Sequence, residues 1–314
     1  MRYKLSIGVV LTMLALAACG SPATGTKAPT AKPAPTTAAA KPTTAPAKAT
    51  TAPAPTVAGK PTTAPAPTTA PAANVNGKIA ILLPETKTAR YESQDLPDFK
   101  AKLTALGFDV TKNLIYSNAN QDAAAQQQQA EAALTNGAKV LVLDPVDSNA
   151  AAAIADMAKA KGVPVIAYDR LINNSTGVNY YISFDNEQVG KLQAQSLLDA
   201  LKGKTNPAIV MINGSPTDNN AAMFKKGAHS VLDGKVTIAK EYDTPDWSPD
   251  KAQNEMTQAL TALGNKVDGV YAANDGTAGG AIAAMTAGGL KTLPPVTGQD
   301  AELAAIQRIL AGQQ

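Results

Sequence analysis

The chain of 314 residues is poor in the side chains that most often build metal sites and covalent cross-links. It has one cysteine, one histidine and one tryptophan, and aromatic residues make up 4% of it. A single cysteine excludes an internal disulfide, and one cysteine with one histidine supplies too few ligands for the common zinc sites. His229 has no serine and aspartate at a recognisable spacing either, so we expect a solvated or packed histidine. The composition therefore predicts no metal and no cofactor.

Acidic residues are absent from the first 76 positions. This segment holds 7 of the 28 basic residues, which leaves 21 basic against 25 acidic residues in the remainder. The overall charge of +3 thus belongs to the N-terminal segment, and the rest of the chain is slightly acidic. No cluster of lysine and arginine with interleaved aromatic residues occurs, so we do not expect nucleic-acid binding.

The N-terminus has the pattern of an export signal. It begins with two basic residues, and residues 5–18 are apolar but too short for a good membrane span. The next motif, Leu-Ala-Ala-Cys at 16–19, resembles the lipobox of bacterial lipoproteins, in which cleavage leaves the cysteine as the lipidated first residue. We expect residues 1–19 to be a lipoprotein signal peptide and Cys19 to anchor an extracytoplasmic protein to the membrane. An ordinary secretory signal with an incidental cysteine is the alternative.

Residues 20–76 consist largely of alanine, proline and threonine, and the hexapeptide Pro-Thr-Thr-Ala-Pro-Ala begins at both Pro42 and Pro61. Such a segment has too little apolar surface to offset the entropy of ordering it, and its prolines favour extended conformations. We expect a disordered tether between the membrane anchor and a folded part.

From residue 78 onward, short apolar runs alternate with amphipathic helical stretches, which predicts an α/β fold with parallel sheets. The series repeats, so we expect two similar lobes, at 77–184 and 185–314. In the first lobe we expect strands at 78–83, 140–143, 165–168 and 180–184, a second strand that begins at 108–110, and helices at 96–106, 123–135 and 150–161. In the second we expect strands at 209–213, 236–242, 269–273 and 296–298, and helices at 187–201, 221–232, 249–263, 277–287 and 301–311.

Polar side chains gather where these strands end. Ligands of open α/β sheets bind outside the carboxyl ends of the strands, so these clusters are expected to surround one crevice. Carboxylates, amides and a guanidinium around a crevice suit a small molecule with many hydroxyl groups. The clusters contain Asp169 and Arg170, Asp218 and Asn220, Asn274 and Asp275, and Gln299 and Asp300. Asp144 also follows a strand but is expected to cap the next turn, and Asp185 is expected to cap a helix.

Taken together and in order, these motifs resemble those of the type I periplasmic sugar-binding proteins, most closely the D-xylose-binding subgroup. The resemblance covers the chain from residue 78 to the end. It implies two Rossmann-like lobes joined by a hinge. The motifs are Ala-Tyr-Asp-Arg at 167–170, Tyr-Ile-Ser-Phe-Asp-Asn-Glu at 181–187, Gly-Ser-Pro-Thr-Asp-Asn-Asn-Ala at 214–221, Asn-Asp-Gly-Thr-Ala-Gly-Gly-Ala at 274–281 and Gly-Gln-Asp-Ala at 298–301.

The resemblance implies a set of sugar contacts. Carboxylates accept hydrogen bonds from neighbouring hydroxyls, guanidinium and amide groups donate to the same oxygens, and aromatic faces cover the C–H side of a sugar ring. Tyr91 stands where the xylose proteins have a tryptophan, which leaves the identity of the sugar open. The implied contacts are Arg90, Tyr91, Asp169, Arg170, Asp218, Asn220, Trp247, Asn274 and Asp300.

The function implied is that of a monomeric solute receptor that binds an aldopentose or similar monosaccharide and delivers it to an ABC permease. Closure of the lobes around the sugar would be a hinge motion. A sugar-sensing receptor for chemotaxis or for a sensor kinase would share the site. An exported glycosidase would need two carboxylates flanking one bond; Asp169, Asp218 and Asp300 could lie near one another, but nothing in the sequence marks one of them as the acid.

One departure from the family concerns the C-terminal end. Family members return to the first lobe after the helix expected at 301–311, and they add a strand with a ligand-contacting lysine and a long helix. This chain stops at Gln314. We therefore expect a fragment or shortened gene product whose first lobe lacks its last strand and helix, with an exposed sheet edge and weaker sugar binding.

Overall fold

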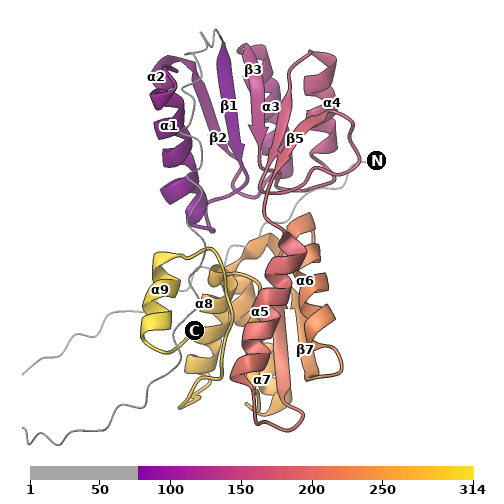
Figure 1. Cartoon of the computed structure of the whole chain (residues 1–314), viewed down its shortest axis with the longest axis vertical. Helices are drawn as coiled ribbons and strands as arrows, with labels where there is room; N and C mark the ends of the chain where they lie inside the picture. The colour runs from indigo at the N-terminus through magenta and orange to yellow at the C-terminus, as the bar shows by residue number, and fades with distance from the viewer. Residues whose placement is uncertain (1–76) are drawn as a thin grey trace, which may run out of the picture. The chain divides into compact units, whose positions relative to one another are not determined.

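The computed structural model describes residues 77–314, which form two parallel β-sheets with helices packed on both faces (Figure 1). The predicted signal peptide, Cys19 and tether lie outside these residues. The α/β fold with parallel sheets is confirmed. None of the helices described has the length and hydropathy needed to span a membrane.

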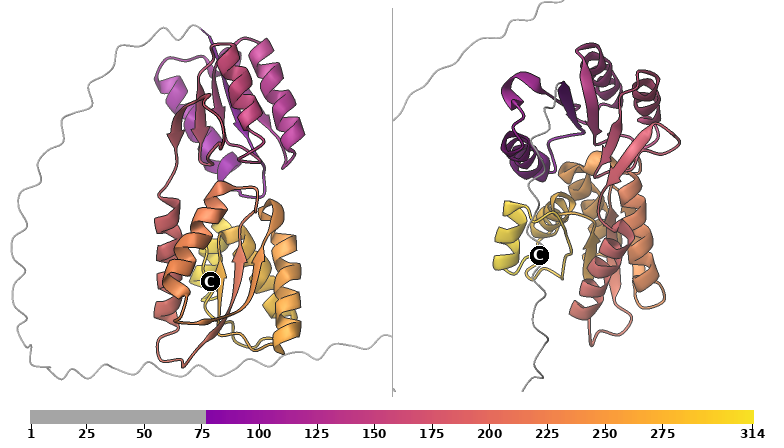
Figure 2. Two further views of the ribbon diagram at one scale, coloured as in Figure 1. Left: turned by 90° about the vertical axis from the view of Figure 1, so that its right-hand side faces the viewer. Right: turned by 45° about the horizontal axis from the view of Figure 1, so that its top comes forward.

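The first lobe contains a five-stranded sheet in the order β2-β1-β3-β4-β5. Its strands are β1 (Lys78–Leu83), β2 (Leu114–Asn118), β3 (Ala138–Leu143), β4 (Val165–Tyr168) and β5 (Val178–Ile182). Its helices are α1 (Leu96–Ala105), α2 (Val110–Asn113), α3 (Ala123–Thr135) and α4 (Ala152–Ala160), with a π-helical turn η1 (Tyr91–Asp95) before α1. Figure 2 shows these elements from two further directions.

The second lobe contains a three-stranded sheet in the order β7-β6-β8. Its strands are β6 (Ala208–Asn213), β7 (Thr237–Asp243) and β8 (Gly269–Ala272). Its helices are α5 (Asn186–Ala200), α6 (Asn219–Leu232), α7 (Pro249–Leu263), α8 (Asp275–Ala287) and α9 (Leu303–Leu310), with a 3₁₀ turn η2 (Pro245–Trp247) before α7.

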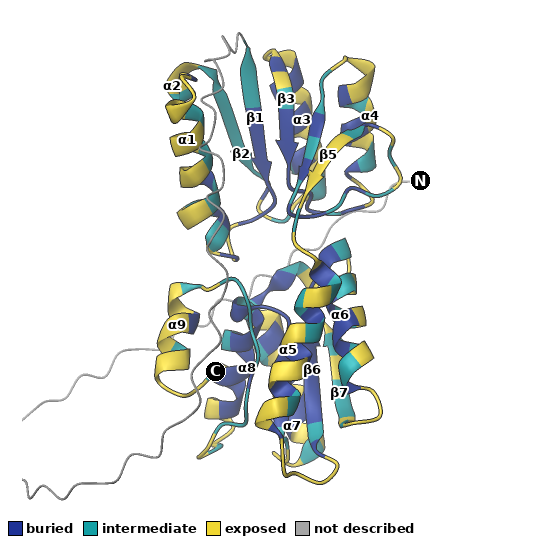
Figure 3. Cartoon of the chain, viewed as in Figure 1, coloured by how far each residue is buried: buried dark blue, intermediate teal, exposed yellow. Residues whose placement is uncertain are grey.

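The central strands are buried on both faces, as expected for parallel sheets covered by helices (Figure 3). Along β1, Ala80 and Leu82 pack toward the side of α3 and α4, whereas Ile81 and Leu83 pack toward Tyr91 and the start of α1. The alternation follows from the two-residue period of a strand. Strand β6 divides in the same way, with α7 and α8 on one face and α5 and α6 on the other.

Most predicted elements are present, and two are corrected. The second strand was predicted to begin at 108–110 but begins at Leu114, because the Asp109 side chain accepts hydrogen bonds from the amides of Thr111 and Lys112 and caps helix α2. The strand predicted at 296–298 is reduced to a single parallel bridge between Val270 and Val296. The Asp185 cap on α5 is confirmed, since its carboxylate accepts from the amide of Gln188 at 3.0 Å.

The chain passes from the first lobe into the second between β5 and α5 (Figure 1). Hydrogen bonds also join the lobes at other points. The Ser148 amide donates to the Thr217 carbonyl at 3.0 Å, and Gln121 Nε2 donates to the Asp246 carbonyl at 2.9 Å. The carboxyl ends of both sets of strands therefore face a shared space.

Candidate functional site

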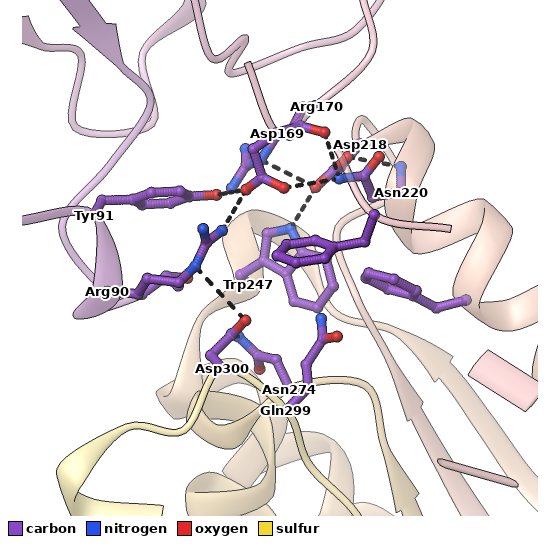
Figure 4. A pocket seen from close by; sticks show the side chains of 13 residues that line it. Arg90, Tyr91, Asp169, Arg170, Asp218, Asn220, Trp247, Asn274, Gln299 and Asp300 are labelled. Atoms are coloured by element: carbon purple, nitrogen blue, oxygen red, sulfur yellow. Dashed lines mark hydrogen bonds and ion pairs between the residues drawn. The ribbon is translucent and has the colours of Figure 1, made fainter. Parts of the chain in front are cut away.

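One pocket lies between the two lobes at the carboxyl ends of their strands, and all nine predicted contact residues line it (Figure 4). Whether they contact a sugar stays a prediction. Sequence reasoning did not include four further lining residues: Thr88, Phe184, Phe224 and Gln299. Of these, Gln299 had been noted beside Asp300 at a strand end, and that position could have identified it.

Asp169 is the meeting point of the first lobe's polar groups. Its Oδ2 atom accepts from Arg90 Nη2 at 2.5 Å and from the Tyr91 hydroxyl at 2.8 Å. From the second lobe, Asn220 Nδ2 donates to the Asp169 carbonyl at 3.1 Å and lies 3.3 Å from its Oδ1. Asp169 has a left-handed φ of 59°, a conformation that aspartate tolerates better than most residues. Both lobes thus bind one carboxylate.

Arg90 places a positive charge near the second lobe. Besides its pair with Asp169, its Nη1 donates to Asp95 at 2.9 Å, and its Nε lies 3.9 Å from Asp300 Oδ1. Burial alone would lower the pKa of Arg90, but the surrounding carboxylates outweigh it and raise the pKa. Arg90 is therefore a permanent cation. Arg90 is the residue immediately before the turn η1.

Arg170 is 2% exposed and sits among carboxylates. Its guanidinium lies 3.1 Å from Asp218, 3.7 Å from Asp144 and 3.8 Å from Glu85. Burial alone would lower the pKa of Arg170, yet these negative partners keep it raised. A buried cation without such partners would be strongly destabilising, so the group depends on them.

Asp218 connects Arg170 to the aromatic wall of the pocket. Its Oδ2 receives both the Arg170 pair and a hydrogen bond from Trp247 Nε1 at 3.0 Å, and its Oδ1 accepts from the Asn220 amide at 2.8 Å, the cap of α6. The Trp247 ring packs edge-on against Phe224, with centroids 6.3 Å apart. Asp218 thus already holds three partners, so it positions its neighbours at least as much as it could contact a ligand.

Asn274 and Asp300 close the ring on the second lobe. Asn274 caps α8, because its Oδ1 accepts from the Thr277 amide at 2.9 Å, and its Nδ2 lies 3.5 Å from Asp300 Oδ2. Burial raises the pKa of Asp300 to about 7, with the Arg90 charge opposing the rise and Asp169 adding to it. The Asp300 carboxyl is therefore partly protonated near neutral pH and can then both donate and accept.

The prediction for Asp144 is wrong. It was expected to cap a turn, but neither of its oxygens has a hydrogen-bond partner among the residues described. The turn cap is Asp147, which accepts from the amides of Asn149 and Ala150. Burial, followed by the nearby Asp169, raises the pKa of Asp144 well above its usual range. It lies behind Arg170 and does not line the pocket.

The arrangement fits a polyhydroxylated ligand better than a hydrolytic reaction. Hydrolysis of a glycoside requires one carboxylic acid and one free carboxylate across a bond. Asp169 and Asp218 are each paired with a guanidinium, and the raised pKa of Asp300 leaves it without a second free carboxylate among the lining residues. His229, as expected, is a packed surface residue between Asp233 and Glu241, 2.9 Å from each. No cluster of metal-ligating side chains occurs in residues 77–314.

Comparisons with known proteins show what the chain is similar to. Residues 79–314 match the family model described as "Periplasmic binding protein domain". The D-xylose-binding periplasmic protein of Haemophilus influenzae is 40% identical over 242 residues, which cover 76% of this chain and 70% of the relative. The multiple sugar-binding periplasmic receptor ChvE of Rhizobium radiobacter is 37% identical over 258 residues, covering 76% and 72%.

Solved structures of other solute-binding proteins are also similar to this chain. A solute-binding protein of an ABC transporter from Clostridium phytofermentans, with bound β-D-glucose, superposes with a TM-score of 0.68 at 33% identity. The match covers 75% of this chain and 76% of that one. A carbohydrate-transporter solute-binding protein from Chloroflexus aurantiacus, in complex with D-glucose, gives a TM-score of 0.66 at the same identity and coverage.

Proposed function

The chain belongs to the periplasmic binding protein family, and from this premise we propose that it is the extracytoplasmic sugar-binding component of an ABC-type importer. Its ligand is D-xylose or a related aldose, bound between the lobes. The proposal has two supports: the polar ring around the pocket, and identity of 37–40% to relatives named for sugar binding.

The observation that carries the proposal is the position of Asp169. It is bound by Arg90 and Tyr91 from the first lobe and by Asn220 from the second. A carboxylate has about four acceptor sites, so Asp169 keeps room for a sugar hydroxyl beside these partners, and the charged and amide groups around it can donate to the oxygens of the same sugar. The Trp247 indole offers an apolar face to the C–H side of a pyranose.

The choice among sugars follows from the cost of leaving polar groups unpaired. A sugar that lacks one matched hydroxyl leaves a buried donor or acceptor without a partner, which costs about 1–3 kcal/mol of binding free energy for each such group. Xylose is favoured by identity to the xylose-binding relative, while Tyr91 in place of a tryptophan points to some difference in the wall of the site. Relatives and structural neighbours are named for several sugars, so related aldoses are the natural comparison.

Binding is coupled to closure. A sugar that touches groups of both lobes only when they are together shifts the population toward the closed form. The closed form would be recognised by the membrane permease. The lipid on Cys19 and the tether at 20–76 would keep the receptor near that permease on the outer side of the membrane.

A thermal-shift panel tests the proposed function. D-xylose, D-glucose, D-ribose and D-galactose are added in turn, and we expect D-xylose or a close aldose to raise the melting temperature with a dose dependence set by its affinity. The matched control is Asp169→Asn, which keeps the shape of the side chain and tolerates its backbone conformation. A cooperative melting transition that no monosaccharide shifts would contradict the proposal.

The anchor is tested separately. Cys19→Ser should release the protein from the membrane fraction in detergent-free fractionation and leave its sugar affinity unchanged. Equal membrane retention of the wild type and the variant would remove the lipid anchor from the account without affecting the sugar site.

A further inference from the structure

Gly214 follows β6 directly and lies against the ring of Trp247. A β-carbon at position 214 would be 2.5 Å from Cζ3 of the indole, and closer still to Cζ2 and Cη2. Real β-carbons essentially never come within 3.0 Å of a heavy atom outside their own residue and its two chain neighbours, so any side chain here requires the indole to move. Gly214 is not among the glycines with a left-handed φ. The need for glycine therefore comes from this close approach and not from the backbone.

The indole has little freedom to give way. Its Nε1 atom donates to Asp218 at 3.0 Å, its ring packs edge-on against Phe224, and the residue is only 5% exposed. A rotation that clears a new β-carbon breaks the hydrogen bond to Asp218, whose Oδ2 also binds Arg170. Displacement of the ring therefore disturbs a polar contact between the two lobes.

The backbone that carries the indole is also held in place. Asp246 and Trp247 have consecutive left-handed φ values of 61° and 52°, a costly conformation for residues other than glycine. Two contacts stabilise it: the Asp246 amide donates to Ser215 Oγ at 3.3 Å, and Gln121 of the first lobe donates to the Asp246 carbonyl. The turn offers no easy alternative position for the ring.

We infer that Gly214 is a positioning residue of the proposed sugar site. Because it has no side chain, it lets the Trp247 indole occupy its place as the aromatic wall of the pocket. This inference rests on the proposed function and adds to it a residue that does not line the pocket. Gly214 acts through Trp247 and Asp218, so its effect is on the placement of the wall and not on any hydrogen bond to the sugar.

The test uses Gly214→Ala, with fluorescence as a local signal. Trp247 is the only tryptophan of the chain, so intrinsic tryptophan emission reports on this ring alone. We expect the affinity for the best sugar of the panel to fall at least about tenfold, as overpacking displaces the wall. The emission maximum should shift to longer wavelength and acrylamide quenching should increase, because a displaced indole becomes more exposed.

Two further variants make the result specific. Gly276→Ala is the matched control, because a β-carbon there would have its nearest neighbour, Pro249, at an ordinary 3.5 Å, and we expect wild-type affinity and emission. Trp247→Phe removes the outer ring atoms that Gly214→Ala would strike. In that background, adding Gly214→Ala should change sugar affinity less than about threefold, since the clash is gone.

Each outcome decides the inference. Wild-type affinity and emission in Gly214→Ala would overturn it, and so would an equal loss of affinity in the wild-type and Trp247→Phe backgrounds, which would indicate a backbone effect. If Gly214→Ala fails to fold, a folded and sugar-binding double variant supports the steric argument, and a double variant that also fails to fold contradicts it. If the wild type binds no monosaccharide, the proposed function fails, while emission and quenching still test whether Gly214 sets the position of the indole.

Discussion

The two lobes contribute unlike chemistry to the pocket. Both cations that line it, Arg90 and Arg170, come from the first lobe, whereas the second lobe supplies the indole, three amides and two carboxylates. The pairs that cross between lobes are accordingly of opposite charge, at 3.1 Å for Arg170 and Asp218 and 3.9 Å for Arg90 and Asp300. Neither lobe alone has the complete ring of polar groups. The difference indicates charge complementarity between the lobes, and under the proposed function a shared sugar would add to it.

The largest effect is expected where both lobes meet on one carboxylate. Asp169→Asn keeps the side-chain shape but removes the charge that binds Arg90, and it weakens the acceptor offered to sugar hydroxyls. We expect a loss of about 2–4 kcal/mol, or roughly 30- to 1000-fold in affinity, measured by titration calorimetry. An unchanged dissociation constant would remove Asp169 from the binding site.

A smaller loss is expected when only the second lobe's wall is removed. Trp247→Ala deletes the apolar face but leaves the first lobe's charged groups in place. We expect a loss of about 2 kcal/mol, or roughly 30-fold in affinity, with the order of preference among sugars altered. Should Trp247→Ala weaken binding more than Asp169→Asn does, the comparison would reverse and the apolar wall would dominate recognition.

A still smaller effect is expected on the free energy of unfolding, from the titration of Asp300 in the second lobe. Burial raises the pKa of Asp300 to about 7, so between about pH 4 and pH 7 the folded protein binds more protons than the unfolded chain. The stability that this group contributes is complete at low pH and is lost as the pH rises through its folded pKa. Asp300→Asn removes this loss and suits the left-handed φ of 91°. We expect Asp300→Asn to be more stable than the wild type at pH 8, by about 1–2 kcal/mol, and to lose this advantage at pH 4. Denaturant unfolding at both pH values measures it, and an equal difference at the two would contradict the assignment.

The smallest effect lies on the outer edge of the second lobe, away from the pocket. Burial alone would lower the pKa of His229, but hydrogen bonds to Glu241 and Asp233 outweigh it and raise the pKa. The resulting stability is present below the ordinary histidine pKa and is lost as the pH rises through the folded value. His229→Gln should therefore cost under about 1 kcal/mol at pH 5.5 and less at pH 8. Denaturant unfolding of the two proteins shows it, and a larger cost at pH 8 would contradict the sign.

The sequence predicted the elements whose boundaries are set by local signals such as helix caps. Helices α3 and α7 and strand β4 have the predicted bounds, because Asp122 caps α3 and Pro249 begins α7. The start of the second strand was misplaced at 108–110 for the same kind of reason, since the cap at Asp109 was overlooked. Short apolar runs and helix caps are readable in a sequence, and they predicted most elements of this fold.

The sequence predicted most of the residues that line the pocket but not which contacts each of them makes there. Strand-end clusters and family motifs led to nine residues that do share a pocket. They could not show that Asp218 is already occupied by Arg170 and Trp247, or that Asp144 is buried without a hydrogen-bond partner among residues 77–314. Phe184 and Phe224 were missed because a sequence does not tell whether an aromatic ring points into a cleft or into a core. These properties depend on side-chain direction across elements far apart in the chain.

Calorimetric titration of D-xylose into the purified protein shows whether two unlike half-sites form one sugar site. We expect saturable binding to a single site per chain, weakened both by Asp169→Asn in the first lobe and by Trp247→Ala in the second. Binding that survives either substitution unchanged, or the absence of binding for xylose and for every related aldose, would contradict it.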